Sequence, residues 1–302
     1  MFNKSSIDDV DLQYCKSDMG KALLSILIIT LLGGLASCTK NDCPTGYLIK
    51  VTVKDKNYFN ADQFSQLEKK DETLPFHQFI KTVYYTLRDT KTGNLVYQSD
   101  VVNVEEGKDF YPITVDGFSV GEYELTVWGN RTPDVPSGEL HYNGQEQTDI
   151  YVARTILSFP MSYKSVSLAL ERAKGKLVIF CSNFPASIGS LSQKVSSIYE
   201  TVDSQLEYTG EAEVNKEVAV NNIIETYLAP TSAGKISKLN LNFFSLTRAA
   251  SSPTLTLPEM EITIHRNEIT AVKVDYNIIS GNWEIWLNID GEWIMVHHLS
   301  IK

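Results

Sequence analysis

The stretch 47-YLIKVTVK-54 decides how this chain folds. Tyrosine, isoleucine and valine fill its odd-numbered positions, and lysine and threonine fill the even-numbered positions from 50 onward. A period of two with β-branched residues is typical of a half-buried strand. The same rhythm returns in short segments between turn signals, and long helical periodicity is nearly absent. The sequence therefore predicts an all-β protein.

A different pattern precedes this strand. Lys21 is followed by the apolar run Ala22–Leu32 and then by Leu35-Ala36-Ser37-Cys38. A charged end, a short apolar middle and small residues at the cut are the order of a secretory signal peptide. The run is shorter than the roughly 20 residues that a transmembrane helix needs. The Leu-Ala-Ser-Cys tetrapeptide matches the bacterial lipobox. This match predicts cleavage between Ser37 and Cys38 and attachment of acyl chains, palmitate among them, to Cys38.

The first residues fit a signal peptide poorly because residues 1–18 are acidic. Met19 makes a better start, and residues 1–37 are left out of the fold prediction in either case. Residues 38–46 are then a short lipidated tether. Eight extended residues reach at most about 30 Å, so the folded part is expected to stay near the membrane.

Composition narrows the classes of partner. The chain has 302 residues, a formal net charge of −10 and a pI near 5.1. Such a chain repels phosphate, and no basic patch interleaved with aromatic residues is visible, so nucleic acid is not expected as a partner. Membrane attachment is expected through the lipid on Cys38 alone.

Two cysteines remain once Cys15 and Cys38 are assigned to the leader and the lipid. Cys43 and Cys181 pair as a disulfide in one interpretation, which an oxidising compartment permits. In the other, Cys181 is a small buried hydrophobic residue in the apolar run that ends with it.

Pairs of alternating segments around turn residues indicate hairpins. The last of them turns at Asp290-Gly291. Three hairpins are expected, within 79–101, 262–274 and 283–301.

The length suits two domains. Residues 171–175 have the composition of a hinge, which predicts an N-terminal β-sandwich over 47–172 and a C-terminal one over 173–302. Within these, residues 62–67 are expected to form a helical turn and residues 129–148 a long surface loop.

Catalytic motifs are absent from the sequence, so no enzymatic activity, cofactor, metal or small-molecule substrate is expected. His297 and His298 are neighbours on a strand and point to opposite faces, so they do not chelate one metal. Acidic pairs such as Glu211 and Glu213 are expected to be solvated surface groups.

A resemblance emerges from several segments in order. Lipobox Cys38 is followed by Asp42-Cys43-Pro44 and the strand at Tyr47. Two longer segments follow, Val83–Val96 and Gly121–Asn130. Over about residues 38–130 the chain resembles the FimB-type fimbrillin-A associated anchor family, the lipoproteins at the base of type V fimbriae.

This resemblance implies two tandem transthyretin-like β-sandwiches after a lipoprotein signal peptide, at the cell outer membrane and facing the surface. It also implies that the protein anchors a fimbrium, limits the length of its shaft and binds a fimbrillin-type shaft subunit by β-strand complementation. The terminal strand 293–301 is the candidate partner strand, with an ordinary last strand as the alternative. On it, alternation predicts one shared face for Trp293, Met295, His297, Leu299 and Ile301.

Two other functions stay open at this stage. A surface lipoprotein that binds glycans requires Trp128 or Trp283 to lie exposed on a concave face. On a strand, Trp283 and Trp286 are expected to face opposite sides. A fimbrial tip or adhesin subunit of the same superfamily would share the fold, and the short tether favours an anchor.

Overall fold

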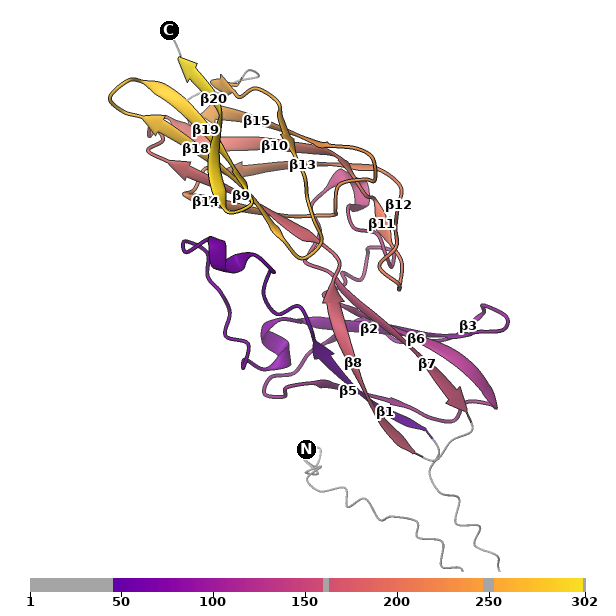
Figure 1. Cartoon of the computed structure of the whole chain (residues 1–302). Helices are drawn as coiled ribbons and strands as arrows, with labels where there is room; N and C mark the ends of the chain where they lie inside the picture. The colour runs from indigo at the N-terminus through magenta and orange to yellow at the C-terminus, as the bar shows by residue number, and fades with distance from the viewer. Residues whose placement is uncertain (1–45, 160–162, 247–252, 301–302) are drawn as a thin grey trace, which may run out of the picture. The chain divides into compact units, whose positions relative to one another are not determined.

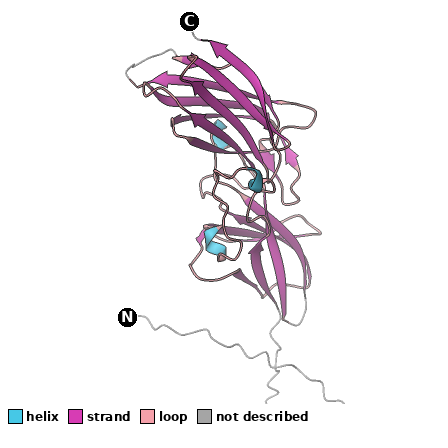
Figure 2. Ribbon diagram, turned by 60° about the vertical axis from the view of Figure 1, so that its left-hand side comes forward, coloured by secondary structure: helices cyan, strands magenta, loops and turns pink. Residues whose placement is uncertain are grey.

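The structure, a computed structural model, describes residues 46–159, 163–246 and 253–300. These residues belong to one compact unit made almost entirely of strands, as predicted (Figures 1 and 2). The strands of the first half are β1 (Tyr47–Val53), β2 (Thr82–Asp89), β3 (Leu95–Gln98), β4 (Val102–Asn103), β5 (Tyr111–Val115), β6 (Gly121–Gly129), β7 (Tyr151–Phe159) and β8 (Lys164–Arg172). Those of the second half are β9 (Gly175–Ser182), β10 (Ile188–Ile198), β11 (Thr201–Val202), β12 (Tyr208–Thr209), β13 (Ala212–Ala219), β14 (Ile223–Leu228), β15 (Ser237–Ser245), β16 (Leu255–Thr256), β17 (Met260–Ile262), β18 (Ile269–Asn277), β19 (Asn282–Ile289) and β20 (Glu292–Ser300). Three short 3-10 helices complete the secondary structure, η1 (Ala61–Gln63), η2 (Phe76–Gln78) and η3 (Tyr142–Gly144).

The first half is one curled sheet in the order β3-β2-β6-β7-β8-β1-β5, with β4 also paired to β2. Strand β7 pairs with β8 only at Tyr151 and Val152, and the sheet bends there so that its two parts face each other. Alternate residues of β1, among them Ile49 and Val51, enter the core between these parts, as the period of two predicts.

The second half packs two sheets, β13-β10-β15-β16 and β14-β9-β18-β19-β20, over a common core. Strand β9 is buried on both faces, as its continuous apolar sequence predicts. It lies between antiparallel β14 and parallel β18, just as β1 lies between antiparallel β5 and parallel β8. The second half thus repeats the central pairing of the first and adds the β19–β20 hairpin beyond β18 (Figure 1).

The two halves are joined by more than one connection. Phe64, from the segment that follows β1, packs on the outer face of β9 and β18 with Phe180 and Ile269. Asn60 exchanges two hydrogen bonds with the backbone of Ile269, at 2.8 and 2.9 Å. The segment after β1 therefore covers part of the outer face of the β9 sheet.

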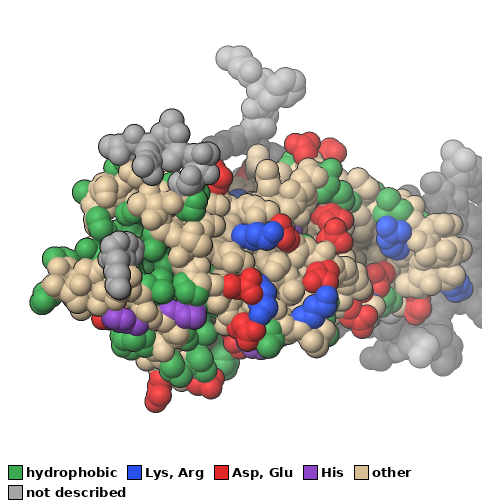
Figure 3. Space-filling view, turned by 90° about the horizontal axis from the view of Figure 1, so that it is seen from above, with side chains coloured by type: hydrophobic (Ala, Val, Ile, Leu, Met, Phe, Trp, Pro, Cys, Tyr) green, Lys and Arg blue, Asp and Glu red, His purple; other side chains and the backbone are tan. Residues whose placement is uncertain are grey.

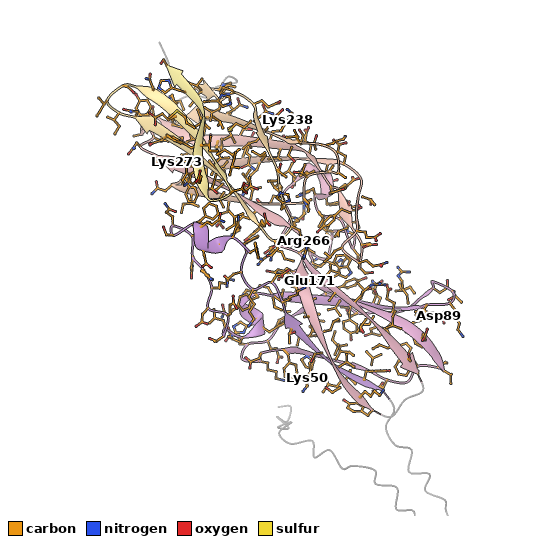
Figure 4. All side chains as sticks on the ribbon, viewed as in Figure 1. Lys50, Asp89, Glu171, Lys238, Arg266 and Lys273 are labelled. Carbon is orange, nitrogen blue, oxygen red and sulfur yellow. The ribbon has the colours of Figure 1, made fainter. Side chains whose placement is uncertain are left out.

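The expected hinge at residues 171–175 is part of this packing. Arg172 is 4% exposed and Lys174 is fully buried. Arg266 bonds the carbonyl of Arg172 and lies 3.4 Å from the carboxylate of Glu171 (Figure 4). At Gly175 a Cβ would lie 2.2 Å from the carbonyl oxygen of His265, so only glycine fits there. The segment is closely packed, and its role as a hinge stays a prediction. The division into two domains itself stays a prediction.

Two of the three expected hairpins are confirmed. Strands β2 and β3 pair, and so do β19 and β20, which are joined by a two-residue turn. Asp290 and Gly291 both have positive φ, the geometry that lets such a turn follow the twist of the strands. The third prediction is wrong, because β17 pairs with β15 in one sheet and β18 pairs with β9 and β19 in the other. Strand β13 was not anticipated.

Among the described residues, no helix combines the length and apolar character that crossing a membrane requires. Within the same residues, no group of three or more histidine, cysteine, aspartate or glutamate side chains is placed to hold a metal ion.

Candidate functional site at the β20 edge

Strand β20 is the outermost strand of the β9 sheet. It pairs with β19 on one side, and within the part of the chain that the structure describes no strand pairs with its other side. An edge of this kind presents a row of unpaired backbone N–H and C=O groups, to which another strand can add. The strand contains nine residues, no lysine and no proline, and Glu292 is its one carboxylate. It lacks most of the side chains that protect sheet edges from pairing.

A β-bulge interrupts the pairing of β20. The register pairs Ile285 with His297 but Trp286 with Met295, so Val296 has no residue opposite it. One extra residue in a strand reverses the alternation of side chains beyond it. The bulge therefore divides β20 into two parts that present opposite faces.

The prediction of one shared face is wrong for this reason. Trp293 and Met295 lie on the same face as Trp286, whereas Leu299, opposite Trp283, lies on the core face with His297. Ile301 lies outside the described residues. The sequence alone does not reveal the bulge. With or without an extra residue at Val296, alternation places apolar side chains on one face of the strand.

Four consecutive apolar side chains of β20 are exposed. Trp293, Ile294, Met295 and Val296 are each 37–45% exposed. Seen from above in Figure 3, hydrophobic and histidine side chains gather at the left-hand end of the face, while lysine and arginine side chains lie nearer its middle and right. The apolar run of β20 thus combines exposed side chains with a free backbone edge.

A hollow of about 720 Å³ lies beside β20 on the outer face of the sheet. The Trp293 ring meets the Phe180 ring edge-on, with centroids 5.9 Å apart, and the Lys273 ammonium lies 5.7 Å from the centre of the Trp286 ring. Gln66, from the segment after β1 that covers part of this face, also lines the hollow. The hollow can accept side chains of a strand added at this edge.

Strand β3 is a second exposed edge, at the end of the sheet in the first half. Leu95, Val96 and Tyr97 are 42–44% exposed, but the strand has only four residues. Its register also leaves Val96 unpaired, between Leu87–Tyr97 and Arg88–Leu95. A strand added to β3 would form about half as many backbone hydrogen bonds as one added to β20.

The other predicted site residues fall into two groups. Ser37, Cys38 and Cys43 lie outside the described residues. Cys181 is a free cysteine in the core, where burial raises the pKa of its thiol to about 12. This agrees with the second interpretation of Cys181, in which it is a small buried hydrophobic residue.

The carboxylates weighed as an acid–base pair are each held by a separate lysine. Glu213 lies 2.8 Å from the Lys194 ammonium, and Glu211 pairs with Lys235. Both ion pairs lower the pKa of the carboxyl group, through the hydrogen bond from the lysine first. A general acid needs a raised pKa, so neither group is suited to that role.

Neither Trp128 nor Trp283 forms an exposed platform for a glycan. Trp128 is 5% exposed and Trp283 is 2% exposed, and both lie in the core of the second half. Trp286 lies on the outer face, so Trp283 and Trp286 do face opposite sides, as predicted. The exposed aromatic surface that a glycan-binding function required at Trp128 or Trp283 is not there.

Together, fold and edge define an all-β protein with curled, sandwich-like sheets and a long exposed edge strand. No family model matches the chain, and no curated protein matches it. Solved structures do. The fimbrial anchor protein Mfa2 from Porphyromonas gingivalis is similar over 84% of this chain and all of its own, at 11% identity and a TM-score of 0.48. A protein described as an adhesin from Bacteroides thetaiotaomicron is similar over 84% of this chain and 99% of its own, at 12% identity and a TM-score of 0.49. A fimbrial assembly protein from Parabacteroides distasonis is similar over 83% of this chain and 98% of its own, at 10% identity and a TM-score of 0.44. These three neighbours are described as fimbrial or adhesion proteins.

Proposed function

We propose that this protein is an outer-membrane lipoprotein that anchors a type V fimbrium at its base. In this proposal the acyl chains on Cys38 hold the protein in the membrane. Strand β20 receives a strand of the first fimbrillin-type shaft subunit and so ends the shaft. The protein acts by binding and has no enzymatic activity.

The exposed, apolar, nine-residue edge of β20 is the observation that carries the proposal. Along an antiparallel edge, alternate residues direct their backbone groups outward, so β20 offers about four such residues to an incoming strand. Each net hydrogen bond is worth about 0.5–1.5 kcal/mol, and burial of the exposed apolar side chains adds to this. β-strand addition uses this combination, in which the backbone supplies affinity and the side chains supply specificity.

The membrane part of the proposal rests on the lipobox. One acyl chain binds a membrane marginally, with a constant of about 10⁴ M⁻¹, whereas two or more chains hold firmly. A bacterial lipoprotein cysteine carries more than one chain. A base that resists the pull on a fimbrium needs that strength.

The test is pull-down of the lipidated protein from outer membranes, followed by identification of the major companion. We expect a fimbrillin-like subunit with the wild-type chain and its loss with Val296→Pro. Proline is tolerated at bulges, and Val296 has no residue opposite it in β19, so the proline ring is placed where it should disturb the β19–β20 ladder least and crowd an incoming strand.

Val96→Pro is the matched control, because Val96 is also an unpaired residue in an exposed edge strand. It should retain the companion. Loss of the companion with Val96→Pro, but not with Val296→Pro, would move the binding site to β3 and contradict the proposal for β20. Deletion of residues 292–302 is a poorer test, since Leu299 packs against the core.

A further inference from the structure

A second hollow, the basic cavity, lies where the loops of the first half meet the beginning of β9. It has a volume of about 550 Å³. Segments far apart in the sequence build it: the chain after β1, the start of β2, the loop after β6 and the ends of β7, β8, β9 and β14. The side chains that define its chemistry are Lys56, Lys70, Lys81, Arg131, Arg172 and Lys176, the acids Glu68 and Asp149, and the rings of Tyr58, Phe79, Tyr151 and Tyr227.

The charge of this cavity is opposite to that of the protein. Six cationic side chains and two carboxylates line it, while the chain as a whole carries −10. Two of the cations are neutralised internally. Arg172 lies 2.8 Å from Asp149 and Lys176 lies 3.0 Å from Glu225.

The other four cations have no such partner. Among the residues that the structure describes, no carboxylate lies within ion-pair distance of Lys56, Lys70, Lys81 or Arg131. Lys56 and Lys70 bond only backbone carbonyls and approach the Phe79 ring. Like charges held together without counter-ions repel one another. The cavity therefore carries a net positive charge at the surface of an acidic protein.

Two further observations concern the surroundings of these cations. Arg131 is fixed above the Tyr84 ring at 4.3 Å, and its Nε is buried without a hydrogen-bond partner. The pKa of Lys70 is lowered by burial and then by the nearby Lys81 and Arg172 charges. The Tyr84 ring thus holds the Arg131 guanidinium in place, and the mutual repulsion of the cations favours the binding of an anion.

We propose that the basic cavity binds a small polyanion, a ligand that carries two or more carboxylate, sulfate or phosphate groups. The volume lies within the range of about 300–1,000 Å³ that is usual for small-ligand sites. The guanidinium of Arg131 can donate hydrogen bonds to two oxygens side by side, and the ammonium of Lys81 is free for a second anionic group. This proposal is independent of the anchoring role, and it departs from the expectation that no small molecule is bound.

The aromatic rings are the cavity's walls, not stacking platforms. Arg172 lies over the Tyr58 ring at 4.0 Å and over the Tyr151 ring at 4.9 Å, and Lys176 lies 5.0 Å from the Tyr58 ring. These faces are therefore occupied by cations of the protein itself. Charge and hydrogen bonding, more than sugar or base stacking, select the ligand.

Isothermal titration calorimetry on the full-length chain in detergent tests the proposal. The probes are citrate, inorganic pyrophosphate and a heparin-derived sulfated disaccharide. We expect saturable one-to-one binding of at least one probe that weakens as the salt concentration rises. Binding of citrate and pyrophosphate identifies a free small anion as the kind of ligand that the cavity binds. Binding of the disaccharide alone identifies an acidic glycan.

Variants decide whether the heat of binding measured by calorimetry is due to a ligand bound in this cavity. Lys81→Glu and Arg131→Gln should each weaken binding by about tenfold or more, a loss of about 1.4 kcal/mol. Lys91→Glu makes the same change in net charge as Lys81→Glu on the exposed β2–β3 turn and should leave binding unchanged. Melting temperatures of all three variants exclude unfolding as the cause. Absence of binding by every probe, or an equal effect of Lys81→Glu and Lys91→Glu, overturns the proposal.

Discussion

Arg172 is a buried side chain at the junction between the two halves. A single substitution there removes several contacts at once. Its Nε donates to Asp149 over 2.8 Å, and the two side chains are 5% and 15% exposed. It also donates to the side chains of Asn267 and Tyr151. Arg172→Met keeps the apolar stem and removes the charge, so Asp149 is left buried without its cation, and its Oδ1 already has no partner.

The expected cost follows from this geometry. Removing one member of a buried ion pair costs about 3–5 kcal/mol, mostly because the other charge stays buried and unpaired. With a urea m-value near 3 kcal/mol/M for a chain of this size, the unfolding midpoint should fall by about 1–2 M. Equilibrium unfolding in urea, followed by tryptophan fluorescence, measures this on the Cys38→Ala chain without lipid.

Two controls make the reasoning refutable. Arg88→Met removes an exposed arginine that bonds one carbonyl of its own turn and should change stability by less than about 0.5 kcal/mol. The Arg172→Met, Asp149→Asn double variant removes both charges and should regain a large part of the loss. A loss below about 1 kcal/mol for Arg172→Met, or no recovery in the double variant, would refute the role given to this ion pair.

Three further predictions concern the lipid, a buried base and the thiol. Cys38→Ala should fold normally but leave the membrane fraction, as fractionation would show; unchanged retention contradicts lipid anchoring. Complete burial lowers the pKa of Lys174 to about 7, so above that pH the folded chain has released a proton that the unfolded chain still holds up to about pH 10. Stability should therefore rise from pH 7 to 9 by at most about 1.4 kcal/mol per pH unit, and this contribution should level off below pH 7, where both states hold the proton. Lys174→Met should flatten the slope above pH 7 in urea titrations; an unchanged slope counts against it. In the Cys43→Ser chain, Cys181 should react with Ellman's reagent only after unfolding, because burial raises the pKa of its thiol to about 12, and rapid reaction of the folded chain would contradict this.

Local patterns predicted most strands, because alternation and turn residues act within a few positions. The period of two places β1 correctly, and Asp290-Gly291 marks the last hairpin. Pairing between distant segments is a different matter. The pattern of residues 262–274 is typical of a hairpin. In the structure β18 instead pairs with one edge of the central strand β9, whose other edge pairs with β14.

The candidate sites were less predictable still. Strand β20 stood out by its apolar residues, but the bulge at Val296 depends on its register with β19 and has no sequence signal. The basic cavity gathers lysines and arginines between positions 56 and 176 that are isolated in the sequence. Arg172 and Lys174 looked like hinge residues because composition does not reveal which charges find buried partners.

The most direct test of the proposed anchoring function counts fimbriae on cells that carry Val296→Pro or Val96→Pro in the otherwise unchanged lipoprotein. Electron microscopy before and after shear measures the number of cell-bound fimbriae and their length. Val296→Pro should release fimbriae into the medium and lengthen those that remain, while Val96→Pro should match the wild type. Cells with Val296→Pro that keep fimbriae of normal number and length would contradict the assignment of β20 as the anchoring edge.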